Sequence, residues 1–366
     1  MCKDIVKLAS RSCLLTLLLL GFASAQAQEM QPEPAIQAPL ADESLLLDVI
    51  EYNDSGYVAV GARGHVLLSE DGRQWKQAGN VPLQATLTRA THFGRRLWAV
   101  GHDASIISSM DGGETWFIQY RDPEGDDLAP PEAQGPLLDV LFLNPNEGIA
   151  IGAYGRYMTT DDGGIHWNPG RIADRVASEA IDWEAMARRQ GGYETLPEDF
   201  EMPGGSSLLD MLDKGCYQYN ECHLNAILRL SDGRLMIAAE RGYGFRSEDD
   251  GKTWEAFRFP YPGSMFGLVK RGGCVIAFGL RGHIQRSCDF GTTWEAIETG
   301  SEQTLMGGDV DAQGRVFLVG AGATRITIGP NGEIESEADL LGSDYAAVVV
   351  GGDEMILVGD NGVRHD

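Results

Sequence analysis

The sequence predicts an all-β fold, a seven-bladed β-propeller built from four-stranded blades. A short apolar strand ending in Gly, or in Glu in one copy, recurs seven times, with ends at residues 61, 101, 152, 240, 279, 320 and 359. Successive ends are 40, 51, 88, 39, 41 and 39 residues apart, and short strands with a period near 40 are typical of propeller blades. A turn motif, S/T-x-D-(x)-G-x-x-W, recurs five times. A motif present in so many repeats indicates architecture rather than a single site.

The N-terminal segment has the pattern of a secretory signal peptide. Lys3, Lys7 and Arg11 precede the apolar run CLLTLLLLGF, and small residues follow over 23–27. The run is short for a membrane span. We expect cleavage after Ala25 or Ala27, a signal peptide over 1–27, a single propeller over 28–366 and a periplasmic location. No Cys stands at the cleavage site, so no lipoprotein anchor is expected.

The chain is strongly acidic. Its formal net charge is −25, and because residues 1–25 carry three basic residues and one acidic residue, their removal takes it to −27. Such a surface repels nucleic acid and anionic lipid head groups. We therefore expect no binding of nucleic acid and at most a peripheral association with a membrane. Separately, we expect a monomer.

Each repeat predicts four strands in the same order. In the first repeat, an inner strand over 46–52 is followed by the apolar strand over 57–61 and by a third strand over 65–69. The Asp turn then leads to an outer strand over 75–79. The Asp is expected to cap turn amides, the Gly to take φ > 0 and the Trp to fold over the hairpin. These structural pairs are Asp71 and Trp75, Asp111 and Trp116, Asp162 and Trp167, Asp249 and Trp254, and Asp289 and Trp294.

The last repeat ends after its third strand, at residue 366. Residues 33–40 precede the first complete repeat and are available as a fourth strand. Pairing of the two termini in one blade would close the ring and remove a free sheet edge. We therefore expect closure by three strands from the C-terminus and one from the N-terminus.

Four cysteines remain after the signal peptide. In an oxidising compartment they predict two disulfides, Cys216–Cys222 and Cys274–Cys288. The second pair flanks the 281–282 turn nearly symmetrically. Free buried thiols remain an alternative for that pair. No Cys/His spacing resembles a zinc site, and no metal or cofactor is expected.

The turns between the second and third strands carry a candidate binding face. In a propeller these turns open on the face opposite the Asp turns. Four of them place an Arg at or beside the turn, an unexpected cluster on so acidic a chain that suits bidentate binding of carboxylates. The alternative is that each Arg pairs with an acid of a neighbouring blade. The candidate residues are Arg63, Arg156, Arg241, Arg281, His65, His283, Tyr154 and Tyr243.

The two long steps in the repeat mark insertions on the same face. Residues 171–222 form an insert between the third and fourth blades, with two short helices expected after Ser178 and after Ser206 or Ser207. These helices would act as a lid, or else the insert is a solvated decoration. An acidic loop over 122–135 is the second insertion. Long insertions of this kind are often functional.

The turn motifs resemble the Asp-box (BNR) repeat, as in SEDDGKTW and SMDGGETW. The longer phrase AVG-x-x-G-x-(I/V)-x-x-S-x-D-G-G-x-T-W resembles the photosystem II stability/assembly factor family over about residues 40–366. The resemblance implies a lumenal or periplasmic seven-bladed propeller. It also implies a non-enzymatic factor that binds a membrane-protein intermediate. Proteins of this type are also expected in non-photosynthetic bacteria, beside other envelope complexes.

Two functional hypotheses follow. The first is an exported scaffold whose Arg face binds an exported or inner-membrane protein complex. The second is a sialidase-like glycoside hydrolase or acidic-glycan-binding propeller, because sialidases also carry Asp boxes. In that case Arg63, Arg241 and Arg281 would bind the substrate carboxylate, with Tyr154 or Tyr243 nearby and Glu240 as a candidate base. Sialidases typically have six blades and the repeats here are nearly uniform, so we favour the scaffold and expect no catalytic residues.

Overall fold

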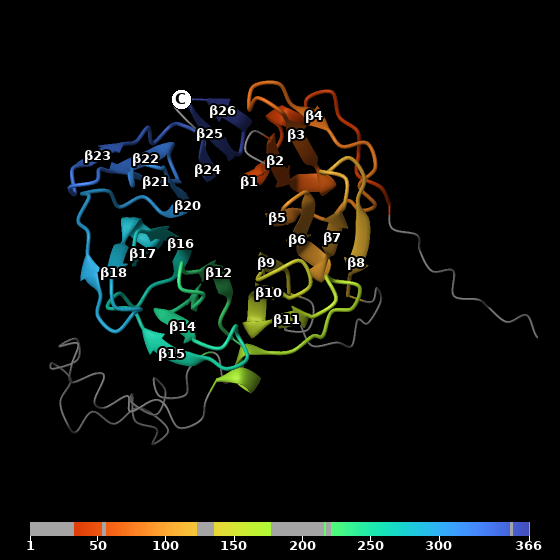
Figure 1. Ribbon diagram of the computed structural model, residues 1–366. Coiled ribbons are helices and arrows are strands. Elements are labelled where there is room, and N and C mark those ends of the chain that lie inside the picture. Colours follow the sequence, from red (N-terminus) through yellow and green to blue (C-terminus); the bar gives the residue numbers. More distant parts are fainter. Residues whose placement is uncertain are drawn as a thin grey trace, which may run out of the picture. The chain divides into compact units, whose positions relative to one another are not determined.

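Seven antiparallel sheets follow one another along the chain and form a ring (Figure 1). The computed structural model describes residues 33–52, 56–122, 135–176, 216, 221–351 and 354–365, all of which lie in the unit Pro32–Asp366. The prediction of a seven-bladed propeller is confirmed. The expected signal peptide lies outside the described residues. In the described part of the chain, no helix is long and apolar enough to cross a membrane.

Each sheet is a meander of strands in sequence order. The first three blades contain β1 (Leu46–Tyr52), β2 (Gly56–Gly61), β3 (Val66–Ser69) and β4 (Lys76–Gln77); β5 (Leu87–Phe93), β6 (Arg96–Gly101), β7 (Ile106–Ser109) and β8 (Phe117–Tyr120); and β9 (Leu137–Phe142), β10 (Gly148–Gly152) and β11 (Tyr157–Thr160). The outer edge of blade 3 continues only as an isolated bridge between Thr159 and Asn168.

The remaining four blades repeat this plan. They contain β12 (Leu224–Arg229), β13 (Leu235–Ala239), β14 (Tyr243–Ser247) and β15 (Glu255–Arg258); β16 (Met265–Arg271), β17 (Cys274–Gly279), β18 (Ile284–Ser287) and β19 (Glu295–Ala296); β20 (Leu305–Val310), β21 (Val316–Gly320), β22 (Thr324–Ile328) and β23 (Ile334–Glu337); and β24 (Tyr345–Gly351), β25 (Glu354–Gly359) and β26 (Gly362–His365). The second strands are almost entirely buried, which explains their continuous apolar sequences.

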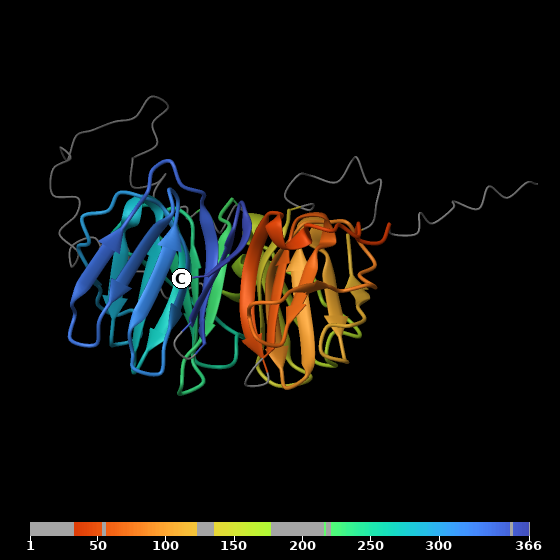
Figure 2. The same cartoon turned by 90° about the horizontal axis from the view of Figure 1, so that it is seen from above.

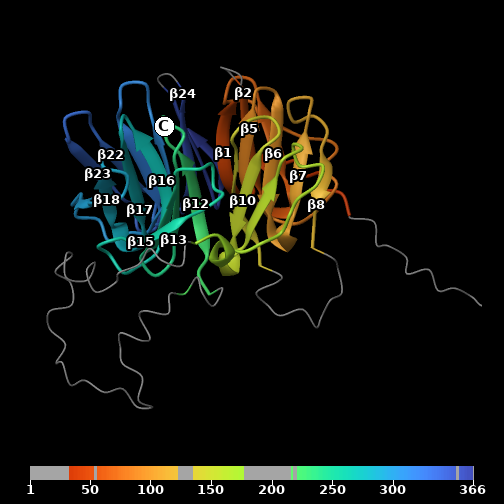
Figure 3. The same cartoon turned by 60° about the horizontal axis from the view of Figure 1, so that its bottom comes forward.

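The first strand of every blade lies innermost, where each contacts the first strands of both neighbouring blades. This closed circle runs from β1 through β5, β9, β12, β16, β20 and β24 back to β1 (Figure 1). Seen from the side, the strands run from one face of the ring to the other (Figures 2 and 3). Apolar side chains between adjacent sheets form the core, in clusters that each join two neighbouring blades, such as the cluster of blades 7 and 1 around Leu46, Val49 and Val358.

The ring closes differently from the prediction. In the described residues the last sheet has three strands, and 33–40 add no fourth strand to β26. Instead the Ala35 amide donates to the Val81 carbonyl at 2.9 Å, and η1 (Ala41–Glu43) packs against β26. Pro34 and Pro39 lack amide donors, which explains why this segment does not pair as a continuous strand. The N-terminal segment thus seals the junction of blades 7 and 1 without extending a sheet.

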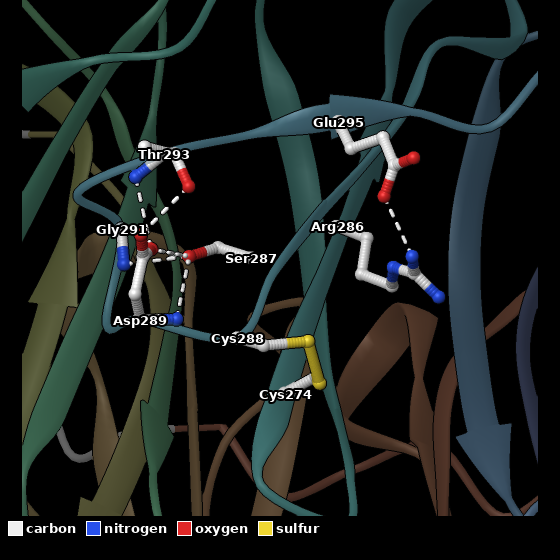
Figure 4. Close-up of a disulfide and its surroundings, with 8 residues drawn as sticks. All are labelled: Cys274, Arg286, Ser287, Cys288, Asp289, Gly291, Thr293 and Glu295. Carbon is white, nitrogen blue, oxygen red and sulfur yellow. Dashed lines mark hydrogen bonds and ion pairs between the residues drawn. A yellow bond between two sulfur atoms is a disulfide. The ribbon is translucent and has the colours of Figure 1, made fainter.

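The Asp turns join third and fourth strands, as predicted. In blade 2, Asp111 Oδ1 accepts from the Thr115 amide at 3.0 Å, and the Gly113 amide donates to Ser109 Oγ at 2.8 Å. The indole N–H of Trp116 donates to the Gly113 carbonyl at 2.8 Å, and the ring is 1% exposed. Blade 5 shows the same hydrogen bonds of Ser287 and Asp289 with the Gly291 and Thr293 amides (Figure 4). Its Trp294 differs, because the residue is half-buried and its indole N–H has no hydrogen-bond partner among the described residues.

The described residues contain two disulfides, Cys216–Cys222 and Cys274–Cys288. The second joins the start of β17 to the residue after β18, with the Cα atoms 4.0 Å apart, beside the Asp turn of blade 5 (Figure 4). The β17–β18 register, in which Val275 faces Ser287, brings the two cysteines together. The expected helices of the 171–222 insert and most of the 122–135 loop lie outside the described residues.

Candidate functional site

The turns between second and third strands lie on one face of the ring, which we call the 2–3 face. It comprises residues 62–65, 102–105, 153–156, 240–243, 280–283, 321–324 and 360–362. These turns contact the connections that lead to the next blade, as where the Gly64 amide donates to the Ala85 carbonyl at 3.1 Å. The Asp turns lie at the other ends of the strands, where Tyr52 Oη donates to the Gly112 carbonyl at 2.9 Å. Binding chemistry on the 2–3 face is therefore separate from the Asp turns.

The tips of the turns in blades 1 to 6 have a left-handed backbone, whereas in blade 7 the left-handed residue is Gly362, at the start of β26. The φ angles are 58° at Arg63, 56° at Arg241 and 56° at Arg281. A left-handed conformation costs a non-glycine residue roughly 1–2 kcal/mol. Blade 6 has Gly322 at this place, with φ of 59°. Local backbone energetics alone would therefore favour glycine at the positions that arginine occupies, and such positions often mark function.

The structure divides the candidate arginines into two groups. Arg63 and Arg281 are exposed and have no ion-pair partner among the described residues. Arg241 is also exposed and lies 3.1 Å from Glu221 Oε2. Such exposed pairs contribute little to stability. Arg63, Arg241 and Arg281 therefore remain available to a ligand.

Arg156 is a correction to the predicted face. The residue is 5% exposed, and its guanidinium makes a bidentate pair with Asp122, with both N–O distances 2.9 Å. Burial of this pair between the 2–3 turn of blade 3 and the end of blade 2 makes Arg156 structural. The alternative of an inter-blade ion pair thus holds at this position.

The predicted aromatic and histidine residues also separate by burial. His65 and Tyr243 are 1% and 2% exposed, so neither is accessible to a partner. Burial, and then the charge of Arg63, lowers the pKa of His65. Tyr154 is half-buried against His223, and the exposed His283 stacks on Tyr261 with ring centroids 3.6 Å apart. Of these four predicted residues, only Tyr154 and His283 stay at the surface of the 2–3 face.

A buried charge network at the ring's centre was not predicted. Arg89 on β5 lies between Asp48 of β1, at 3.1 Å, and Asp139 of β9, at 3.6 Å. Burial raises the pKa of Asp139 to about 6, opposed by Arg89. Although burial acts to lower the pKa of Arg89, the two carboxylates raise it. An Asp inside each apolar LLDV phrase, at 46–49 and 137–140, was the available signal.

The same network borders a cavity on the ring's axis. The cavity has a volume of about 210 Å³ and lies among the inner strands of blades 2 to 6. Arg89 and Asp139 contribute its charged side, and Gly267, Gly307 and Gly308 contribute its other side. A Cβ at these glycines would collide with Phe278, with the Ala346 carbonyl and with Leu318, so close packing of neighbouring strands explains the three glycines.

The geometry does not assemble the sialidase-like site. Arg63 is on blade 1, whereas Arg241 and Arg281 are on blades 4 and 5, which do not adjoin blade 1 in the ring. Glu240 accepts a hydrogen bond from the His223 amide at 3.1 Å rather than pairing with Arg241. In the described part of the chain, no three His, Cys, Asp or Glu side chains gather as metal ligands.

Curated relatives are similar to this chain in sequence, and solved structures share its fold. The photosystem II assembly lipoprotein Ycf48 of Synechococcus sp. (strain CC9902) is 27% identical over 214 residues, which cover 52% of this chain and 58% of the relative. The chloroplastic photosystem II stability/assembly factor HCF136 of Arabidopsis thaliana is 30% identical over 131 residues, 34% of this chain and 30% of the relative. The resemblance to the photosystem II stability/assembly factor family is confirmed. No family model matches the chain.

The structural comparison extends over most of the chain. A structure of YCF48 bound to a D1 peptide has a TM-score of 0.61 and 16% identity, covering 90% of this chain and 94% of that one. YCF48 from Cyanidioschyzon merolae has a TM-score of 0.60 and 17% identity, covering 90% and 97%. At these identities the likeness shows the fold. In sequence, the match spans about three-fifths of the first curated relative's length.

Proposed function

We propose that the chain is an exported, non-enzymatic propeller scaffold that binds a partner protein through its 2–3 face. It would serve as an assembly or accessory factor for an envelope or membrane protein complex. The observation that carries the proposal is the exposure of Arg63 and Arg281 at left-handed turn tips. Similarity to photosystem II assembly factors, one of which is solved with a D1 peptide, supports a partner-binding role.

The chemistry of the face favours a partner segment that carries carboxylates. An exposed guanidinium offers two parallel N–H donors to a carboxylate, and the bond is charge-assisted. The rest of a chain with net charge −25 repels acidic partners, so recognition of a carboxylate has to be local. Arg241 adds a third guanidinium to the face once its ion pair with Glu221 is broken.

A comparison of variants tests the proposal. Affinity purification from crosslinked envelopes would use the wild type, Arg63→Gly/Arg281→Gly and Arg95→Gln. Glycine suits the left-handed turn tips, so the double variant keeps the turns while it removes both guanidinium groups. Arg95 is an exposed arginine in the turn between β5 and β6, on the Asp-turn face, and serves as the matched control.

We expect the wild type and the Arg95→Gln variant to recover the same membrane complex, and the double variant to lose it. Equal recovery by all three proteins would contradict a role for the arginine positions. The wild type should also fractionate with the periplasm, and a cytoplasmic location would contradict the proposed export.

A further inference from the structure

We propose that Leu340 and Leu341 form a hydrophobic anchor that inserts into an apolar pocket of the partner protein, a pocket bordered by basic side chains. The inference rests on the proposed function, because it assigns a second contact on the same face. It names a place at which no binding residue was predicted from the sequence.

The two leucines occupy the tip of a well-formed turn. The Gly342 amide donates to the Asp339 carbonyl at 2.7 Å, which closes a turn with Leu340 and Leu341 at its centre. The Leu341 amide donates to Asp339 Oδ1 at 3.1 Å. Central turn positions favour Gly, Pro, Asn, Asp and Ser, so two adjacent leucines depart from local preference.

Their exposure is the second observation. Leu341 is 98% exposed and Leu340 is 70% exposed, the highest values among the large apolar side chains in the described part of the chain. Scattered exposed apolar residues are ordinary, whereas an adjacent pair at a turn tip concentrates apolar area at one point. Burial of this pair in a pocket would remove that area from water.

The turn is fixed to the propeller on the 2–3 face. The Asp339 amide donates to the Gly322 carbonyl at 2.9 Å, and the Gly322 amide donates to Asp344 Oδ1 at 2.8 Å. Gly322 is the left-handed tip of blade 6, in the position that Arg281 takes in blade 5. The leucine pair therefore lies on the part of the ring that runs from blade 5, which carries Arg281, through blades 6 and 7 to blade 1, which carries Arg63.

Charge around the turn selects the kind of partner. Asp339 is exposed in the turn itself, and Asp360 is exposed in the 2–3 turn of blade 7, where its amide donates to the Asp344 carbonyl at 3.2 Å. Asp344 also accepts from the Gly322 amide, so three carboxylates lie around the leucine turn. Glu337 on β23 pairs with Arg325 at 2.8 Å. An anionic lipid surface would repel this rim, whereas Lys or Arg side chains around an apolar pocket would complement it. A pocket on a protein is thus favoured over a membrane surface as the site into which the leucine turn inserts.

For the test, the partner complex that the wild type recovers is purified and is then titrated with four proteins. These are the wild type, Leu340→Ser/Leu341→Ser, Arg63→Gly/Arg281→Gly and Ile165→Ser. Ile165 is 69% exposed in an Asp turn on the opposite face, so it matches the leucines in exposure but not in place. All three substituted side chains in the leucine and isoleucine variants are at the surface. Far-ultraviolet circular dichroism with thermal melting checks the folding of both variants.

We expect the leucine variant to raise the Kd at least tenfold and Ile165→Ser to leave it unchanged. If the arginine variant loses binding and the leucine variant keeps the wild-type Kd, the anchor is wrong while the proposed function stands. If the arginine variant keeps the wild-type Kd, the arginine face fails, and the leucine result then still decides the anchor by itself.

Vesicle flotation separates the two kinds of surface. We expect the wild type to bind neither phosphatidylcholine vesicles nor vesicles that contain phosphatidylglycerol. Flotation of the wild type that is lost in the leucine variant would show a lipid anchor and overturn the protein-pocket assignment.

Discussion

Asp139 Oδ2 accepts a hydrogen bond from the backbone amide of Ile227 at 2.8 Å, although 88 residues separate them in sequence. This bond joins the inner strands of blades 3 and 4. The same relationship recurs where Asp48 accepts from the Ala90 amide and Asp309 from the Val350 amide, each at 2.8 Å. Inner-strand carboxylates therefore fasten neighbouring blades around the axis, in addition to the apolar packing between sheets.

The first prediction concerns the charge at the centre of this ring. Replacement Arg89→Met should lower the free energy of unfolding by about 3–5 kcal/mol, because it leaves the buried Asp48 and Asp139 carboxylates without a cation. Urea unfolding measures the loss. The triple variant Arg89→Met/Asp48→Asn/Asp139→Asn should recover most of it, and a triple variant as unstable as the single one would contradict a charge-based cause.

The Asp turns should matter for stability and not for binding. Replacement Asp111→Ala removes the acceptor of the Thr115 amide and should cost about 1–2 kcal/mol, as loss of a helix cap does. Thermal unfolding measures this cost. The folded variant should bind the partner as the wild type does, and loss of binding by folded protein would assign the turn a functional role instead.

Acid should weaken the same turns. Hydrogen bonds from Thr115 lower the pKa of Asp111 to about 2, and hydrogen bonds from His166 lower that of Asp162 to about 2. Because these folded-state values lie below the ordinary 3.8, the carboxylates contribute stability that is complete above about pH 4 and is lost as the pH falls towards 2.

Unfolding measured between pH 5 and 2 checks the slope. The variant Asp111→Asn/Asp162→Asn should show a shallower loss over this window than the wild type. An identical slope in both proteins would place the acid sensitivity in other carboxylates.

Arginine at the left-handed tips should be dispensable for folding. Replacement Arg63→Gly removes backbone strain but loosens the unfolded chain, so we expect a change within about 1 kcal/mol. By contrast, Arg156→Gly removes the buried partner of Asp122 and should cost about 3 kcal/mol or more. Denaturant unfolding of the two variants compares them directly, and a large loss in Arg63→Gly would make that residue structural.

The Cys274–Cys288 disulfide should stabilise blade 5. It closes a loop with a sequence separation of 14, and a loop of about 15 residues corresponds to about 3 kcal/mol in the chain-entropy model. The variant Cys274→Ser/Cys288→Ser should therefore unfold at lower denaturant than the wild type. Reductant should lower the denaturant midpoint of wild-type unfolding. It should leave unchanged the midpoint of a variant in which all four cysteines are serine, Cys216→Ser/Cys222→Ser/Cys274→Ser/Cys288→Ser.

Sequence by itself determined the repeated parts of this protein. The seven apolar strands, their period near 40 and the Asp-turn motif are local patterns that recur, so each copy reinforces the others and the blade number follows. The turn tips were visible for the same reason, because each follows its second strand at a fixed distance. The prolines in 33–40 argue against a paired strand there, and the prediction that this segment closes the ring did not take them into account.

Only the tertiary structure decided which of these residues meet. Arg156 takes the place in its turn that His65 takes in blade 1, and both residues are buried. That Arg156 meets Asp122 is visible only in the structure, because the end of blade 2 reaches the turn of blade 3. The pairing of Asp139 with Ile227 and the exposure of Leu341 likewise depend on how blades are placed around the axis. Contacts between residues far apart in sequence leave no periodic signal in a single chain, so folding of the ring is needed to define them.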